Sequence, residues 1–256
     1  MTIPRELILG EVIDRTDWSP GLFSLTINAD VAPYQAGQFL KLALQDSSGQ
    51  WIRRAYSLVN APIIYSGVQQ LEFLIIADPD GQLTPLLNQL SVGDEVYVSQ
   101  QASGFMTAAE IPDYAKDLWL LSTGTAIGPF LSILSEMEPM ERFDNLILVH
   151  AVRTVEELVY RDRISELNVN YKGKLHYVPV VSREVCDWSL KGRIPTLLLD
   201  NTIANQISCQ LEPTRSFVYM CGNPSMVRDT AEVLVELGLT KHLRRKPGQF
   251  SSENYW

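Results

Sequence analysis

The chain has 256 residues and a formal net charge of −9, and 46% of its residues are hydrophobic while 20% are charged. This composition is typical of a globular protein with one large domain or two ordinary ones, and the acidic balance argues against general nucleic-acid binding. No run approaches the ~18 apolar residues of a transmembrane helix. Met1–Glu6 lacks a basic segment followed by an apolar one, so no secretory signal is predicted.

The first hundred residues predict an antiparallel six-stranded β-barrel. Short runs rich in β-branched and aromatic residues are separated by Gly, Pro, Asp and Ser. The i, i+3, i+4, i+7 spacing of four leucines predicts one helix, Leu83–Leu90, before the last strand. The predicted strands are Leu7–Asp14, Leu22–Asn28, Gln38–Leu44, Trp51–Val59, Leu71–Ala77 and Glu95–Gln101.

After Pro112 the pattern changes to apolar strands that alternate with helices. This alternation predicts a parallel five-stranded sheet with flanking helices. We therefore expect two domains, residues 1–105 and 112–256. The predicted strands include Leu118–Ser122, Leu146–Ala151, Leu175–Val181 and Phe217–Cys221, and the predicted helices are Ile127–Met137, Val155–Leu167, Ile194–Leu199 and Pro224–Leu237.

The cysteines and histidines predict no metal site. Three cysteines are too few and too scattered for a disulfide framework or a metal cluster, and a fused iron–sulfur domain needs four clustered cysteines. The three histidines are equally scattered. Few cysteines also favour a reducing, cytoplasmic setting. These residues are Cys186, Cys209, Cys221, His150, His176 and His242.

The run Arg53–Val59 places a guanidinium, an aromatic ring and a hydroxyl close together. In a strand, Arg54 and Tyr56 share one face, whereas Ser57 turns to the other. Arg binds phosphate bidentately and Tyr stacks on flat rings, so the pair suits a ligand that carries both groups. A strand with an exposed Arg and a half-buried Tyr accounts for the same residues without a ligand.

Three turns offer backbone amides to a phosphate. Thr123–Pro129 and Met220–Pro224 each follow a predicted strand and open a helix, where glycines let an anion approach the backbone. Asp80–Thr84 leads into the barrel helix with a hydroxyl available. Each turn is also compatible with a plain tight turn, and Cys221 alone is typical of a small core residue.

Arg153, Arg183 and Arg193 follow predicted strands or turns of the second half. Together with Ser182 they form a set that suits a 2′-phosphate and so favours NADP over NAD. Individually, each is typical of an exposed surface arginine.

The C-terminal region adds a basic run and two aromatic rings. Lys241–Lys246 holds four formal positive charges in six residues, which fits a docking patch for an acidic partner or a solvated loop. Tyr255 and Trp256 either fill a core gap or stack on a planar ligand, because termini fray unless something holds them. Glu253 beside them is a candidate proton carrier.

These segments, in this order, resemble the bacterial ferredoxin (or flavodoxin)–NADP reductases of the plant-type superfamily over essentially the whole chain. The resemblance rests on Arg54-Ala55-Tyr56-Ser57, Thr123–Ser132, His150–Arg153, Val181–Glu184, Cys221–Val227, Thr240–Arg245 and Tyr255-Trp256.

The resemblance implies a barrel that binds FAD tightly but non-covalently. In the motif that includes Ala55, it implies that Arg54 contacts the pyrophosphate, Tyr56 the isoalloxazine ring and Ser57 its reactive edge. Leu83 and Thr84 correspond to a second contact with the FAD phosphates.

The resemblance also implies that the α/β domain binds NADP(H) as a substrate. The residues on its 2′-phosphate side are Arg153, Ser182, Arg183 and Arg193. Thr125 corresponds to the junction of nicotinamide and flavin. Tyr255 and Trp256 correspond to the C-terminal tail that returns to cover the flavin or its adenine; because plant-type enzymes end in Tyr, which ring covers which part stays open. The implied catalytic residues are Ser57, Thr125, Cys221 and Glu253.

The implied activity is electron transfer between NADPH and a one-electron carrier, by hydride transfer to FAD N5 and stepwise release of single electrons. Ferredoxin, flavodoxin or both are the implied partners, and they would dock near Lys241, Arg244, Arg245 and Lys246. We expect a cytoplasmic monomer with no metal, nucleic-acid or membrane partner. Two alternatives stay open: a reductase component of an oxygenase system, and a non-catalytic nucleotide-sensing module.

Overall fold

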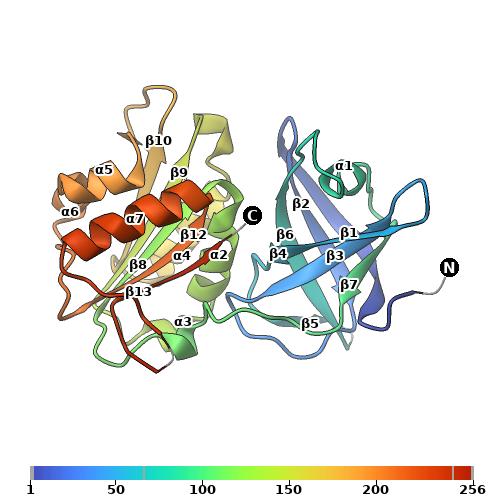
Figure 1. Cartoon of the computed structure of the whole chain (residues 1–256), viewed down its shortest axis with the longest axis horizontal. Helices are drawn as coiled ribbons and strands as arrows, with labels where there is room; N and C mark the ends of the chain where they lie inside the picture. Colours follow the sequence, from blue (N-terminus) through green and yellow to red (C-terminus); the bar gives the residue numbers. More distant parts are fainter. Residues whose placement is uncertain (1–2, 66, 244, 255–256) are drawn as a thin grey trace.

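The computed structural model describes residues 3–65, 67–243 and 245–254. A β-barrel and an α/β domain lie side by side along the longest axis of the molecule (Figure 1). None of the helices in these ranges is long and apolar enough to cross a membrane.

The N-terminal sheet is antiparallel and has the strand order β4-β3-β7-β1-β2-β6-β5. A bridge between Leu58 and Phe73, with a 2.9 Å bond from Val59 N to Glu72 O, joins the β4 side to β6 and closes the barrel. The predicted six-stranded barrel is confirmed, and a three-residue hairpin strand, β5, adds to it. The strands are β1 (Leu7–Ser19), β2 (Leu22–Ala29), β3 (Phe39–Gln45), β4 (Trp51–Ser57), β5 (Ile63–Tyr65), β6 (Val68–Ile76) and β7 (Glu95–Ser99).

The barrel helix is shorter than predicted. Helix α1 spans only Thr84–Leu87, and Leu87 and the preceding Leu83 are buried in the barrel core. The Arg15 guanidinium donates to the carbonyl oxygens of Asn88 and Leu90 at 3.1 and 2.9 Å. In a longer helix, backbone amides of a further turn would donate to such carbonyls; here the Arg15 side chain donates to them instead.

The second sheet is fully parallel, with the order β11-β10-β9-β8-β12-β13. The prediction of five strands was wrong, because this sheet has six. Strand β11 has only two residues, and β13 has the polar sequence Phe-Ser-Ser-Glu-Asn, so neither produces an apolar run. The strands are β8 (Asp117–Thr123), β9 (Asn145–Val152), β10 (Leu175–Val181), β11 (Leu190–Lys191), β12 (Ser216–Gly222) and β13 (Phe250–Asn254).

Helices cover both faces of this sheet, as predicted. Alternate residues of β8 divide between the two faces: Leu118 and Leu120 pack with α2 and α4, whereas Trp119 and Leu121 pack with α5, α6 and α7. Figure 1 shows α7 across the near face. The helices are α2 (Gly128–Ser135), α3 (Met137–Met140), α4 (Arg161–Asn170), α5 (Ile194–Leu199), α6 (Thr202–Ile207) and α7 (Pro224–Glu236); three short 3-10 turns are η1 (Ala108–Glu110), η2 (Gly124–Ile127) and η3 (Val155–Glu157).

Two predicted helices are divided in the structure. The Ile127–Met137 prediction ends at Ser135, because Glu136 is extended at ψ 91° before α3 begins. In the Val155–Leu167 prediction, the α-helix begins only at Arg161. The backbone of Tyr160 is left-handed with φ 59°, which interrupts a continuous helix.

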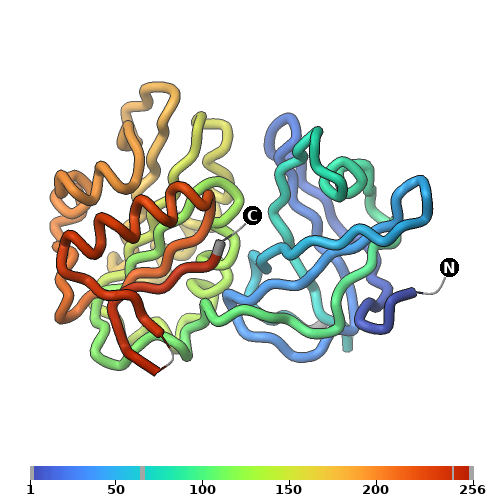
Figure 2. Tube along the Cα trace, in the orientation of Figure 1, coloured from blue at the N-terminus to red at the C-terminus, as the bar shows by residue number. Residues whose placement is uncertain are grey.

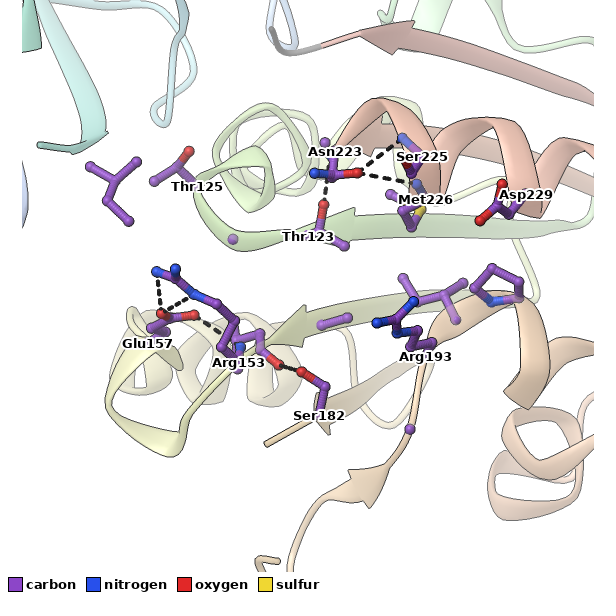
Figure 3. Close-up of a pocket in the computed structure, with 18 of the residues that line it drawn as sticks. Thr123, Thr125, Arg153, Glu157, Ser182, Arg193, Asn223, Ser225, Met226 and Asp229 are labelled. Carbon is purple, nitrogen blue, oxygen red and sulfur yellow. Dashed lines mark hydrogen bonds and ion pairs between the residues drawn. The ribbon is translucent and has the colours of Figure 1, made fainter. Parts of the chain in front are cut away.

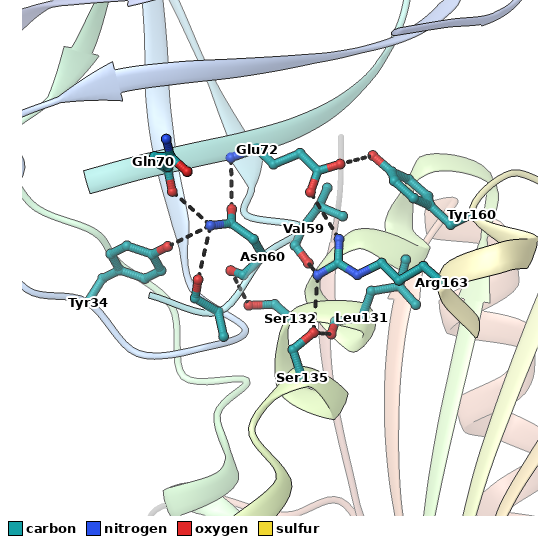
Figure 4. A network of polar contacts seen from close by, with 11 residues as sticks. Tyr34, Val59, Asn60, Gln70, Glu72, Leu131, Ser132, Ser135, Tyr160 and Arg163 are labelled. Carbon is teal, nitrogen blue, oxygen red and sulfur yellow. Dashed lines mark hydrogen bonds and ion pairs between the residues drawn. The ribbon is translucent and has the colours of Figure 1, made fainter. Parts of the chain in front are cut away.

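A network of polar contacts joins the two domains (Figure 4). The Arg163 guanidinium on α4 pairs with Glu72 of the barrel at 2.9 Å and donates to Val59 O at 3.1 Å. The Tyr160 hydroxyl donates to the same carboxylate at 2.7 Å, and Ser132 on α2 donates to Asn60 O at 2.7 Å. Partly buried pairs of this kind hold the domains in one orientation and so fix the geometry of any site between them.

The end of β13 lies beside the chain that connects the two sheets. Glu253 accepts a 2.8 Å hydrogen bond from the backbone N–H of Phe105, 148 residues away in sequence. The tube in Figure 2 shows the last described residues running toward the barrel side of the α/β domain. The C-terminal strand therefore ends near the interface of the two domains.

Candidate active site

A cavity of about 420 Å³ lies at the carboxyl ends of β8, β9, β10 and β12. From β8 the chain adds β9, β10 and β11 on one side, whereas β12 and β13 lie on the other side of β8. Open parallel sheets bind ligands at such a switch point, here between β8 and β12. Three barrel residues, Leu22, Leu74 and Ile76, also line the cavity. The cavity therefore spans the interface between the domains.

The turns after β8 and β12 pack directly against each other. Gly222 has φ +138°, and a Cβ on it would lie 2.0 Å from the Thr123 hydroxyl oxygen. That oxygen accepts a 2.9 Å bond from the backbone N–H of Asn223, whose side chain in turn caps α7 by accepting from Ser225 N and Met226 N. The glycine in the predicted Met220–Pro224 turn is thus required for the approach of the two strand ends.

Arg153, Ser182 and Arg193 line one side of the cavity, opposite Thr123, Asn223 and Asp229 (Figure 3). The Arg153 guanidinium is held by Glu157 at 2.7 Å. Ser182 donates its hydroxyl to Val152 O at 3.2 Å.

Arg183 is placed differently from the other two predicted arginines. It is exposed and is not among the residues that line the cavity. Its backbone N–H donates to Arg153 O at 2.9 Å, so it lies next to Arg153 in space.

The predicted flavin strand β4 has the expected alternation. Arg54 and Tyr56 lie across from Leu42 and Leu40 of β3 and so share a face. Arg54 is exposed and donates to the Gln82 side chain at 2.9 Å. Tyr56 is buried, and burial raises the pKa of its phenol to about 12, against an opposing effect of the Arg54 charge.

Of the other predicted FAD-binding residues of the barrel, some are buried and some are exposed. Ala55 is exposed, Ser57 is buried at the end of β4, and Leu83 is buried in the barrel core. The Thr84 hydroxyl donates to Asp78 O and accepts from Asp78 N, both at 3.1 Å. It therefore closes the turn that carries Gln82, the partner of Arg54.

Glu253 and Cys221 are neighbours in the β12–β13 pairing. Burial raises the pKa of the Glu253 carboxyl, although the amides of Phe105 and Met106 oppose this. Burial, and next the nearby Glu253, raise the pKa of the Cys221 thiol, which is almost fully buried. Thr125 on η2 is also buried and lines the cavity.

Comparison with known proteins identifies the family. Residues 15–104 match the family model of the oxidoreductase FAD-binding domain, and residues 120–232 match that of the oxidoreductase NAD-binding domain. The chain is 46% identical to the flavodoxin/ferredoxin–NADP reductase of Escherichia coli over 250 residues, which cover 97% of this chain and 98% of that protein. The chain belongs to the flavodoxin/ferredoxin–NADP reductase family.

Two further members extend the comparison. The ferredoxin–NADP reductase of Pseudomonas aeruginosa is 35% identical over 246 residues, 92% of each chain. The structure of a ferredoxin NADP+ reductase from Neisseria gonorrhoeae, with bound FAD and NADP, superimposes with a TM-score of 0.88 at 34% identity and covers 99% of this chain and 100% of that one. The predicted family, oxidoreductase class and cofactor pair, FAD and NADP(H), are confirmed.

The residues present fit both cofactors of a reductase of this family. On the barrel, β4 pairs along its length with β3, and Arg54 and Tyr56 place a guanidinium and an aromatic ring on one face of β4. In the cavity, two arginines and a hydroxyl form a donor set suited to a phosphate.

The sequence pattern did not reveal two acidic residues of the cavity, Glu157 and Asp229. Glu157 stands four residues after Arg153, and this i, i+4 spacing of opposite charges was a signal that an ion pair forms there. Asp229 pairs at 2.9 Å with its neighbour Arg228, and no pattern distinguished it from other surface carboxylates.

Some predicted residues fall outside the described ranges. These are Arg244, Tyr255 and Trp256. Of the rest of the basic run, Lys241, Arg245 and Lys246 are exposed, and an antiparallel bridge pairs Leu243 with Lys246.

Replacing Gly222 with alanine should destabilise the reductase by about 2–4 kcal/mol and weaken NADP+ binding, because the new Cβ would displace Thr123. Gly173→Ala is the matched control: Gly173 also has a positive φ, +87°, but nothing lies within 4 Å of an added Cβ. That variant should lose only about 1 kcal/mol. Denaturant unfolding and NADP+ titration of both variants test this, and equal losses would show that the clash with Thr123 is unimportant.

Proposed function

We propose that this chain is a flavodoxin/ferredoxin–NADP reductase whose NADP(H) occupies the interdomain cavity and whose FAD lies along β4. One observation carries the proposal: the cavity at the parallel strand ends is bordered by barrel residues, so a dinucleotide bound there reaches the flavin domain. The relatives named for reduction of flavodoxin and ferredoxin support the choice of carrier. We propose 1–105 and 112–256 as the domains of a cytoplasmic monomer.

On the NADP(H) side, Arg153 and Arg193 bind the 2′-phosphate, with the Ser182 hydroxyl as a third donor. Arg183, next to Arg153, adds positive charge from outside the cavity. Two guanidiniums in one cavity favour a dianionic phosphate over the hydroxyl that NADH carries at the same position. Glu157 orients Arg153 through their 2.7 Å contact.

On the FAD side, Arg54 binds the pyrophosphate, together with the turn that Thr84 closes after Leu83. Tyr56 packs as a neutral phenol against the isoalloxazine ring. Ala55 lies between Arg54 and Tyr56 in sequence, and its side chain is on the opposite face of β4. FAD held by these residues would supply the link between the two-electron hydride chemistry of NADPH and a one-electron carrier.

Around the reacting atoms, Ser57 and Thr125 present buried hydroxyls. Glu253 retains a proton at higher pH than an exposed carboxyl does, because burial raises its pKa, and so it is suited to proton transfer. The Cys221 thiol, with its raised pKa, remains neutral and excludes water. Tyr255 and Trp256, which lie outside the described residues, are assigned the cover of the flavin or its adenine.

The proposal is tested by the colour of the purified protein. We expect flavin absorption bands that bleach anaerobically on addition of NADPH, much faster than with NADH, and that return on addition of oxidised flavodoxin or ferredoxin. A colourless protein that binds NADP+ would instead be a nucleotide-sensing module. A flavoprotein that is reoxidised only by an oxygenase component would be the reductase of that system.

The basic run, with Lys241, Arg244, Arg245 and Lys246, is the proposed docking site for the acidic carrier. Charge reversal at Lys241, Arg245 and Lys246 should lower kcat/KM for the carrier by about tenfold or more at low salt, and this loss should shrink as ionic strength rises. NADPH-dependent reduction of ferricyanide should stay unchanged. Lys172→Glu, an exposed residue after α4, is the control. If kcat/KM for the carrier changed neither with ionic strength nor with the charge reversal, docking at the basic run would be disproved.

A further inference from the structure

His150 is a fully buried residue of β9 that none of the roles above uses. Its Nε2 lies 3.0 Å from the carbonyl oxygen of Gly124, the first residue of η2. A carbonyl oxygen only accepts hydrogen bonds, so Nε2 carries the proton and donates. Among the residues that the structure describes, the other ring nitrogen, Nδ1, has no hydrogen-bond partner.

The ring is neutral at physiological pH. Burial lowers the pKa of His150 to about 4, so one proton is shared between two nitrogens, and the contact with Gly124 places it on Nε2. A buried nitrogen without a partner destabilises the fold relative to an apolar side chain of similar size. The single bond to Gly124 is thus the interaction that distinguishes His150 from a hydrophobic core residue.

That bond fixes a peptide plane at the edge of the cavity. Thr123, Gly124 and Thr125 all line the cavity, and Gly124 has φ +57°. In a trans peptide the carbonyl of one residue and the N–H of the next point in opposite directions. With the Gly124 carbonyl turned toward His150, the Thr125 N–H points away from the sheet interior. A carbonyl facing a phosphate would repel it, whereas an amide attracts it.

We propose that His150 is a positioning residue for NADP(H), which holds the Gly124 carbonyl away from the cavity so that the Thr125 amide faces the dinucleotide pyrophosphate. This inference rests on the proposed NADP(H) site. It assigns His150 to the pyrophosphate part of the ligand and not to the 2′-phosphate, where Arg153 and Arg193 act.

The test compares two ligands on FAD-loaded protein. His150→Leu should weaken binding of NADP+ about tenfold, because it removes one hydrogen bond that orients the turn. Binding of adenosine 2′-monophosphate, which has the 2′-phosphate but no pyrophosphate, should change less than about twofold. His150→Gln places an amide N–H near the position of Nε2 and should restore NADP+ binding. Equal weakening of both ligands, or identical behaviour of the Leu and Gln variants, would overturn the proposal.

Two further measurements keep the result unambiguous. If His150→Leu fails to retain FAD, the comparison uses His150→Asn, whose shorter amide does not reach Gly124, against His150→Gln; equal NADP+ affinities then contradict the proposal.

Arg153→Ala separates the inference from the site on which it rests. If Arg153→Ala leaves adenosine 2′-monophosphate binding intact, the proposed NADP(H) site is wrong; if it weakens that binding while His150→Leu changes nothing, only the role of His150 is wrong.

Discussion

Arg193→Ala is expected to raise the KM for NADPH about 100-fold while the KM for NADH changes less than about twofold. A charge-assisted contact to phosphate contributes about 1.5–3 kcal/mol, and 3 kcal/mol corresponds to a factor of about 100. Arg193 lines the cavity from the residue before α5, beside Ser182 and Arg153. NADH lacks the 2′-phosphate, so it gains nothing from this guanidinium.

Alanine substitutions of Arg153, Arg183 and Arg193 should raise the KM for NADPH by different factors. Arg153→Ala should affect NADPH at least as strongly as Arg193→Ala, because it also leaves the Glu157 carboxylate in the cavity without its 2.7 Å partner. Arg183→Ala should have a smaller effect, since Arg183 does not line the cavity. Steady-state kinetics with ferricyanide as acceptor and both nucleotides measure these ratios. A larger effect for Arg183 than for Arg193, or parallel losses with NADH, would refute the assignment of the 2′-phosphate site.

The fold could be predicted where local patterns determine it. Short runs of β-branched and aromatic residues, separated by turn residues, predicted the six barrel strands, and apolar runs predicted the buried parallel strands β8, β9, β10 and β12. Strands β11 and β13 could not be predicted in this way. Strand β13 is polar and pairs with a strand distant in sequence, as in the pairing of Tyr219 with Ser251, and β11 has only two residues, too few to form a pattern.

The candidate site was predictable in part for the same reason. Residues at strand ends and glycine turns have local signatures, and the structure brings Thr125, Arg153 and Arg193 to one cavity. The contribution of the barrel wall, Leu22 and Leu74, depends on how the domains pack. That packing rests on contacts such as Arg163 with Glu72, 91 residues apart, which no local pattern contains.

Arg54→Ala is expected to weaken FAD binding about 100-fold, so that the protein is purified largely without its flavin. Arg54 is exposed on the face of β4 that it shares with Tyr56, and the loss of a guanidinium there removes a bidentate phosphate contact. The FAD affinity of Arg54→Lys should lie between those of the wild type and Arg54→Ala, because an ammonium keeps the positive charge but cannot donate two parallel hydrogen bonds as a guanidinium does. Arg53→Ala is the matched control: Arg53 is the adjacent residue on the opposite face, paired with Glu6. The FAD-to-protein ratio and titration of the flavin-free protein give the affinities, and equal flavin contents in the Arg53 and Arg54 variants would mean that the face defined by Tyr56 does not bind the cofactor.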